Sequence, residues 1–279
     1  MIQPLLVEKL AVWSSTPRAS QTKGRVLMIH GVSEHSGRHL GTEQALLNAG
    51  YAVVRFDLRG AGRSGGRRQW VREFNDYVED VSTVYRWICR ELDPAPLFLF
   101  GHSLGGAIAL TFLESYQRAF AGCVLSAPAY RLGGAISPLT VAIGRQLVKV
   151  LPTLRIPATS DKGAISKDPQ AVKAFLEDPL CCHTTTLNQG KEILEQLPKL
   201  PAIAAQLTLP ILILHGSLDQ IIRLEGSFEL LEKFGSKDRT LNIIPGGFHE
   251  PHNDQEKEEF FSLLTLWLDG QRALNPTIG

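Results

Sequence analysis

Short apolar runs recur along the chain, and helical segments separate them. The runs cover residues 25–30, 51–58, 96–102, 122–128, 210–216 and 239–245. Apolar runs without alternation are typical of strands buried on both faces of a parallel sheet. Strands that alternate with helices therefore predict an α/β fold, a mostly parallel central sheet with helices on both faces. Residues 5–13 predict one further edge strand.

Capping residues mark two of the longer helices. Asn75 and Asp76 predict the start of a helix with apolar positions at three-four spacing, which Pro94 ends. The last helix is predicted to begin near residues 253–254, with acidic residues in its first turn, and to continue to Gly270.

The alternation stops between residues 129 and 207, a segment with many prolines and no run that resembles a strand. Helical spacing is present at residues 139–151, 168–178 and 186–197. We therefore expect a helical cap over residues 129–207, inserted into an α/β core of residues 1–128 and 208–279. The cap is predicted to cover the carboxyl ends of the strands, where α/β folds bind ligands.

Composition excludes several function classes. With 279 residues, 44% hydrophobic and 20% charged, the chain is typical of a large globular domain. Lys+Arg 29 against Asp+Glu 28 gives no basic excess, so we expect no nucleic-acid partner. No signal peptide is evident and no run reaches the ~18 apolar residues of a spanning helix, so we expect a cytoplasmic protein. The four cysteines lack metal-ligand spacing and are expected to be reduced thiols.

The pattern Gly-x-Ser-x-Gly of a serine hydrolase's nucleophile turn occurs twice, as GRSGG (62–66) and as GHSLG (101–105). Such a turn needs a strand that runs directly into it and a helix that leaves it. GHSLG meets both conditions, whereas GRSGG has neither neighbour. Ser103 is therefore the predicted nucleophile. Ser64 of GRSGG is predicted to form hydrogen bonds within its loop, with Asp57 bonding the loop's amides.

A serine hydroxyl needs a general base, and the base needs a carboxylate that orients it. Asp219 follows the run at 210–216, and His249 follows the glycine pair after the run at 239–245, so acid and base come in the order of an α/β-hydrolase. His252 is the alternative histidine, which could be merely solvated. The HEPH sequence lacks zinc-site spacing, and we expect no metal and no cofactor.

An oxyanion hole requires two backbone N–H groups directed at the developing negative charge. Leu104, the residue after the nucleophile, is predicted to give one, and Val32 in the loop HGVSEHSGR the other. His30 lies in the wrong place in the order for a base and is expected to shape this loop.

With these residues in place, the chain resembles the α/β-hydrolase family of monoacylglycerol lipases and related lysophospholipases over nearly its whole length. HGVSEHSGRHL is similar to the family segment HGxxEHSGRY, GHSLGGAIAL to GHSMGGAIA, RFDLRGAGRSGGRR to DxxGHGxSxGxR, and DPL at 178–180 to a motif of the cap. The resemblance implies the α/β-hydrolase fold with an inserted cap. It implies Ser103, Asp219 and His249 as the triad and the amides of Val32 and Leu104 as the oxyanion hole.

The same resemblance implies that Glu34, Arg38 and His252 lie around the glycerol end of the substrate pocket. We expect Gly31 to be a substrate-binding residue as well. The chain departs from the family pattern at Ala61, where histidine is usual, and at Leu104, where methionine is usual. The cap matches the family poorly outside the DPL motif, and the resemblance implies that the cap contacts the acyl chain.

We therefore expect a cofactor-free hydrolase that cleaves monoacylglycerols or similar monoacyl lipid esters. Lysophospholipase, short-chain esterase and peptidase activities use the same triad and stay open, as does a non-catalytic ligand receptor of this fold. The segment 139–157 combines apolar residues, among them Leu147 and Val148, with basic ones. It predicts either peripheral membrane contact through the cap or a cover for the pocket.

Overall fold

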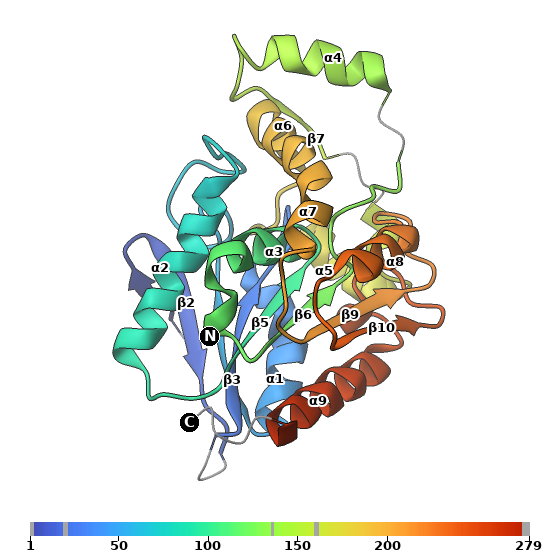
Figure 1. Cartoon of the computed structure of the whole chain (residues 1–279). Coiled ribbons are helices and arrows are strands. Elements are labelled where there is room, and N and C mark those ends of the chain that lie inside the picture. The colour runs from blue at the N-terminus through green and yellow to red at the C-terminus, as the bar shows by residue number, and fades with distance from the viewer. Residues whose placement is uncertain (1–2, 19–21, 135–136, 159–161, 275–279) are drawn as a thin grey trace.

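A twisted sheet forms the centre of the molecule (Figure 1). The structure, a computed structural model, describes residues 3–18, 22–134, 137–158 and 162–274. In these residues the sheet has eight strands in the order β1-β2-β4-β3-β5-β6-β9-β10. The strands are β1 (Leu5–Val7), β2 (Leu10–Ser15), β3 (Gly24–Ile29), β4 (Tyr51–Phe56), β5 (Leu97–His102), β6 (Gly122–Ser126), β9 (Ile211–Gly216) and β10 (Arg239–Ile244).

The predicted, mostly parallel sheet is confirmed. Strands β4, β3, β5, β6, β9 and β10 pair in parallel, whereas β2 pairs antiparallel with β1 and β4. The single edge strand expected over residues 5–13 is in fact two short strands. Glu8 adopts a left-handed φ of 56° between them, and this turn folds the chain back on itself.

Helices cover both faces of the sheet (Figure 1). Helices α1 (Leu40–Asn48) and α9 (Lys257–Leu274) pack on one face, and α2 (Asn75–Glu91), α3 (Leu104–Tyr116) and α8 (Leu224–Lys233) on the other. Strand β5 contributes alternately to the two cores: Leu97 and Leu99 join the cluster with α2 and α3, and Phe98 and Phe100 the cluster with α9. Burial on both faces explains why the strand sequences are continuously apolar.

The last helix begins later than predicted. Residues Pro251–Asn253 form a short 3-10 helix, η5, and α9 starts at Lys257. Asp254 does not cap α9 as its first residue: its carboxylate accepts hydrogen bonds from the amides of Lys167 and Phe248. The same carboxylate also accepts from the neighbouring amide of Gln255, so Asp254 ties the start of this region to Lys167 and Phe248 and does not cap α9.

Between β6 and β9 the chain forms the helices expected for the cap. They are α4 (Pro138–Leu147), η3 (Lys162–Ile165), α5 (Pro169–Glu177), α6 (Leu187–Gln196), η4 (Leu197–Lys199) and α7 (Leu200–Ala204). The expectation that this segment lacks strands is wrong. Strands β7 (Arg155–Pro157) and β8 (Thr184–Thr186) pair antiparallel, and three residues each is too short to show a periodic pattern.

The segment between β6 and β9 contacts several loops of the core. Thr186 donates a hydrogen bond to the carbonyl of Gln69, and Leu132 forms an isolated bridge with Ile222. Helix α4 lies at the outer end of this segment, beyond α6, and Arg145 of α4 pairs with Glu195 of α6 at 4.0 Å (Figure 1). No helix of the described residues is long and apolar enough to span a membrane.

Candidate active site

Ser103 occupies the sharp turn between β5 and α3, with φ 51° and ψ −118°. This left-handed backbone is unusual for a residue with a side chain and is typical of a strained functional turn. The Ser103 amide donates to the carbonyl of Ser126 on the adjacent strand at 2.9 Å. The strand-turn-helix arrangement predicted for GHSLG is thus confirmed.

Close backbone contacts explain the glycines of this turn. A Cβ at Gly105 would lie 2.3 Å from the carbonyl oxygen of Ile29, and one at Gly101 would lie 2.4 Å from that of Gly105. Both distances are shorter than side-chain carbons tolerate, so only glycine lets α3 approach β3 this closely.

The second Gly-x-Ser-x-Gly sequence is a hydrogen-bonded loop. The Ser64 hydroxyl donates to the Asp57 carbonyl at 2.5 Å and accepts from the amide of Ala11 at 2.8 Å. The Asp57 carboxylate accepts from the amides of Ser36 and Arg63. Ser64 forms the predicted hydrogen bond within its loop, to Asp57, and it also ties the loop to β2, which was not predicted; neither contact involves a histidine.

The three residues predicted as a triad lie in one chain of hydrogen bonds. The Ser103 hydroxyl is 3.0 Å from Nε2 of His249, and Nδ1 of His249 is 2.8 Å from Oδ2 of Asp219. Oδ1 of Asp219 accepts from the amides of Ile221 and Ile222 at 2.8 and 2.9 Å. Because Asp219 only accepts, Nδ1 carries the proton and Nε2 of His249 is free to accept the serine proton.

Burial and neighbouring charges shift the pKa values of Asp219 and His249 in opposite directions. Burial opposes ionisation of Asp219, but its contacts with His249 and His215 outweigh burial and hold its pKa well below its ordinary value. Burial lowers the pKa of His249, yet the Asp219 carboxylate outweighs this effect and raises the pKa above its ordinary value of 6.5. Asp219 is therefore a carboxylate that stabilises the protonated imidazole.

The loop after β3 approaches Ser103. A Cβ at Gly31 would lie 3.2 Å from Cβ of Ser103, so the backbone beside Val32 runs past the serine. Leu104 is the first residue of α3, where helix N–H groups have no partner within the helix. The amide of Leu58 donates to Nε2 of His30 at 3.0 Å, which gives His30 the loop-shaping contact expected for it.

A buried polar cluster lies behind this loop. Oε1 of Glu34 accepts from the Gly31 amide at 2.5 Å and from Nε2 of His39 at 3.1 Å. Arg38 pairs with Glu250 at 2.5 Å, and its Nε lies 3.8 Å from Glu34. Burial opposes ionisation of Glu34, but the neighbouring imidazoles, His39 first, hold its pKa well below its ordinary value.

His252 is buried in this cluster, with 1% of its surface exposed, so the alternative that it is merely solvated is wrong. Its ring stacks on that of His39 at 4.5 Å and contacts that of His102 at 4.7 Å. Burial and neighbouring imidazoles hold the pKa values of His102 and His252 well below their ordinary value. The roles of His39 and His102 in this cluster had no signal in the sequence beyond their position next to a motif.

The DPL motif of the cap contacts the same loop. Asp178 pairs with Nε2 of His35 at 2.9 Å, and the amide of Cys182 donates to the carbonyl of Ser33 at 2.8 Å. Ligand atoms of His35, Asp178 and Cys181 lie within 4.8 Å of one another. Burial raises the pKa of the Cys181 thiol, which therefore keeps the proton that a metal would displace. The contact between His35 and Asp178 is a hydrogen bond that joins the segment between β6 and β9 to the loop after β3, and all four cysteines are free.

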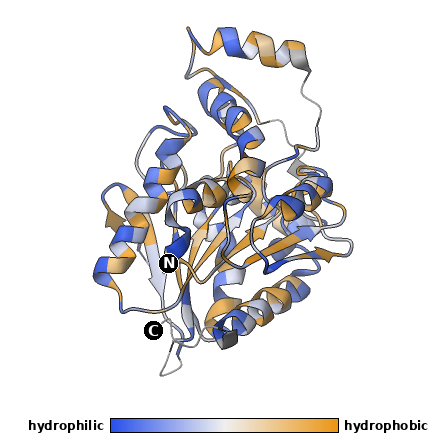
Figure 2. Ribbon diagram, viewed as in Figure 1, coloured by the Kyte–Doolittle hydropathy of each residue, from blue (hydrophilic) through white to orange (hydrophobic). Residues whose placement is uncertain are grey.

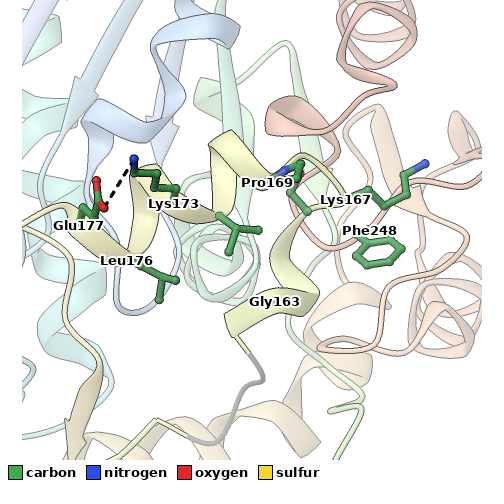
Figure 3. A pocket seen from close by; sticks show the side chains of 9 residues that line it. Gly163, Lys167, Pro169, Lys173, Leu176, Glu177 and Phe248 are labelled. Carbon is green, nitrogen blue, oxygen red and sulfur yellow. Dashed lines mark ion pairs between the residues drawn. The ribbon is translucent and has the colours of Figure 1, made fainter.

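A pocket of about 560 Å³ opens between α5, η3 and Phe248, the residue before His249 (Figure 3). Val172, Leu176 and Phe248 form its apolar lining, and the Lys173–Glu177 ion pair lies at its rim. The triad side chains do not line it; Phe248 connects it to His249 through the backbone.

Known proteins are similar to this chain in sequence and in fold. The sequence profile of the serine aminopeptidase S33 family matches residues 20–256. The monoacylglycerol lipase of Mycolicibacterium smegmatis is 33% identical over 247 residues, 88% of each chain. The human monoglyceride lipase is 30% identical over 256 residues, 90% of this chain and 84% of the human one.

Solved structures agree with the sequence relatives. The crystal structure of the Paleococcus ferrophilus monoacylglycerol lipase has a TM-score of 0.85 at 30% identity and covers 94% of this chain and 99% of its own. A soluble variant of the Saccharomyces cerevisiae monoglyceride lipase, solved with a substrate analogue, has a TM-score of 0.81 at 25% identity and covers 97% and 96%. From its sequence profile, its relatives and its fold, the chain belongs to the serine aminopeptidase S33 family and is a serine hydrolase of the α/β-hydrolase fold.

Proposed function

We propose that this hydrolase cleaves monoacylglycerols, or similar monoacyl lipid esters, to a fatty acid and an alcohol through an acyl-enzyme on Ser103. The observation that carries the proposal is the hydrogen-bonded chain Ser103–His249–Asp219, with contacts of 3.0 and 2.8 Å. The named activities of the relatives that cover most of this chain support the choice of substrate.

In this mechanism His249 removes the proton of Ser103 as the hydroxyl attacks the ester carbonyl, and Asp219 stabilises the imidazolium. The amides of Val32 and Leu104 hold the oxyanion of the tetrahedral intermediate. His249 then gives its proton to the leaving alcohol, and a water molecule activated by the same histidine hydrolyses the acyl-enzyme.

The buried cluster behind the oxyanion loop is the proposed site for the alcohol part of the substrate. Oε2 of Glu34, Nε of Arg38 and both ring nitrogens of His252 are buried without a hydrogen-bond partner among the described residues. Buried polar atoms normally have partners, and the hydroxyl groups of glycerol would supply both donors and acceptors. We assign Gly31 to the same site, because its amide orients the Glu34 carboxylate.

Covalent labelling tests the nucleophile. A fluorophosphonate probe should label the wild type and the Ser64→Ala variant, whereas Ser103→Ala should lose labelling. Turnover of a monoacylglycerol by Ser103→Ala should fall by about 10⁴-fold or more. Ser64→Ala is the matched control, because it removes the other serine that fits the pattern. Labelling that persists in Ser103→Ala would overturn the assignment.

Substrate class needs a separate comparison. Hydrolysis rates should be measured across monoacylglycerols of rising chain length, beside a lysophospholipid, a short-chain p-nitrophenyl ester and an aminoacyl anilide. Monoacylglycerols are expected to give the highest kcat/KM. Faster cleavage of the anilide would favour a peptidase, and labelling without turnover of any of these substrates would reject the lipid ester proposal.

We also propose that helix α4 and the segment after it contact a lipid surface. Leu139 and Ile143 on α4 are 70% and 58% exposed, and Val150 is 73% exposed. Figure 2 shows apolar stretches along this protruding helix. Arg145 is an exposed basic side chain on the same helix, and basic amphipathic helices bind anionic lipid surfaces. Val148, for which the sequence left lipid contact and a cover for the pocket as alternatives, is buried.

Liposome co-sedimentation tests this contact. The double variant Leu139→Ser, Ile143→Ser should bind vesicles that contain anionic lipid less tightly than the wild type, while its rate on a dispersed p-nitrophenyl ester stays unchanged. Leu266→Ser, a change of an equally exposed leucine on α9, is the control. Equal binding by all three proteins would reject the contact.

A further inference from the structure

A second histidine contacts the acid of the triad. His215 lies in β9, one residue before the strand ends, and is fully buried. Its Nε2 lies 3.1 Å from Oδ2 of Asp219, the same oxygen that accepts from His249 at 2.8 Å. Two imidazole rings therefore face one carboxylate oxygen, and the mechanism above uses only one of them.

The surroundings of His215 determine its tautomer. Its Nε2 lies 3.1 Å from the carbonyl oxygen of Ile222, which can only accept, so Nε2 carries a proton. The Ser227 hydroxyl lies 2.7 Å from Nδ1 and donates to it in the neutral ring. Both ring nitrogens are thus engaged, and the positive N–H edge of the ring stays directed between the carbonyl and Asp219.

With His215 included, both oxygens of the Asp219 carboxylate have two contacts each. The amides of Ile221 and Ile222 hold Oδ1, and the two imidazoles lie against Oδ2. The contacts fix the orientation of the carboxyl group, and each one draws negative charge away from it. An N–H group near Oδ2 therefore weakens the pull of Asp219 on the proton of His249.

Building on the proposed triad, we propose that His215 is a positioning residue: its N–H edge orients the Asp219 carboxylate and sets how strongly His249 binds a proton. His215 touches neither the nucleophile nor the substrate in this role. It acts on the reaction through Asp219, and its effect is visible in the pH dependence of the serine's reactivity.

The variants His215→Gln and His215→Met form a matched pair, because the two side chains have similar length and differ in the presence of an N–H donor. The readout is the rate of fluorophosphonate labelling between pH 5 and 9, which does not depend on the lipid substrate. In a plot of labelling rate against pH, the acidic limb is the range in which the rate falls because His249 becomes protonated. Without the donor, Asp219 holds the imidazolium more strongly. His215→Met should therefore shift this acidic limb upward by about 0.5 to 1 pH unit.

His215→Gln should keep the acidic limb close to that of the wild type, and so should His183→Gln, a control that removes a histidine of the cap. Above the limb, His215→Met should label up to about 100-fold more slowly than the wild type, by analogy with other residues that orient a reactive group. A His215→Met variant that labels more slowly at every pH with an unshifted limb would overturn the proposal, since a merely structural role gives that result.

A measurement on the wild type covers the case in which His215→Met does not fold. Nitrogen NMR of labelled histidines should find the neutral ring of His215 as the Nε2–H tautomer, and the Nδ1–H tautomer would overturn the proposal. Failure of the proposed function has a different signature. The wild type would then lack labelling at Ser103 or turnover of lipid esters, whereas failure of the His215 proposal appears only in its variants and its tautomer.

Discussion

Replacing Gly105 with alanine tests the close packing that shapes the nucleophile turn. The added Cβ would lie 2.3 Å from the carbonyl oxygen of Ile29 and 2.7 Å from that of His30. Carbon and oxygen atoms in contact normally lie about 3.3–3.6 Å apart, so the first overlap is about 1 Å. Both neighbours are backbone atoms of β3 and of the residue after it, and they cannot rotate away. Helix α3 must therefore move.

The cost follows from these distances. Overpacking of a well-packed site costs about 1–3 kcal/mol, and we expect the upper end, about 3 kcal/mol, because rigid backbone surrounds the site. With an unfolding entropy of about 2.1 cal/mol/K per residue, a chain of this length loses about 5 °C in Tm. The same movement displaces Ser103 from His249, now at 3.0 Å, and a shift of about 1 Å lowers turnover by about 100-fold.

Thermal unfolding and hydrolysis of a p-nitrophenyl ester measure both effects. Gly190→Ala is the matched control: Gly190 lies inside α6, a Cβ added there would meet no atom within 4 Å, and alanine is the better helix former. The control should gain up to about 1 kcal/mol and keep full activity. A Gly105→Ala protein with unchanged Tm and turnover would refute the packing argument.

Two further predictions concern charge. Because Asp219 raises the pKa of His249, kcat/KM should fall as the pH drops through a value above 6.5. A pH–rate profile measures this value. A fall in kcat/KM that begins only below pH 6.5 would contradict this electrostatic account. Arg55→Leu should destabilise the protein by about 3–5 kcal/mol in urea unfolding, since it leaves the Glu43 carboxylate, now 2.5 Å from the guanidinium, buried without its cation. The double variant Arg55→Leu, Glu43→Leu should recover much of this loss, and equal stability of the two variants would argue against the ion pair.

Local sequence patterns determined the architecture and the choice between the two serines. Burial on both faces makes each central strand continuously apolar, so the strands and their order relative to the helices could be predicted. The same local logic selected Ser103 over Ser64, because a strand and a helix flank GHSLG alone. The positions of Asp219 and His249 followed too, since each lies just beyond the carboxyl end of a strand, and those ends meet at one edge of a parallel sheet.

Tertiary structure alone decided which side chains meet across long sequence separations. The contact between Asp178 of the cap and His35, the stacking of His252 on His39 and the pairing of β7 with β8 all join distant segments. His215 is the clearest case. From the sequence, a histidine in a buried strand would be taken for an ordinary core residue. Its contact with Asp219 exists only because the turn after β9 folds the aspartate back over the strand end. Periodicity and turn chemistry act over a few residues, whereas these contacts depend on how the whole chain packs.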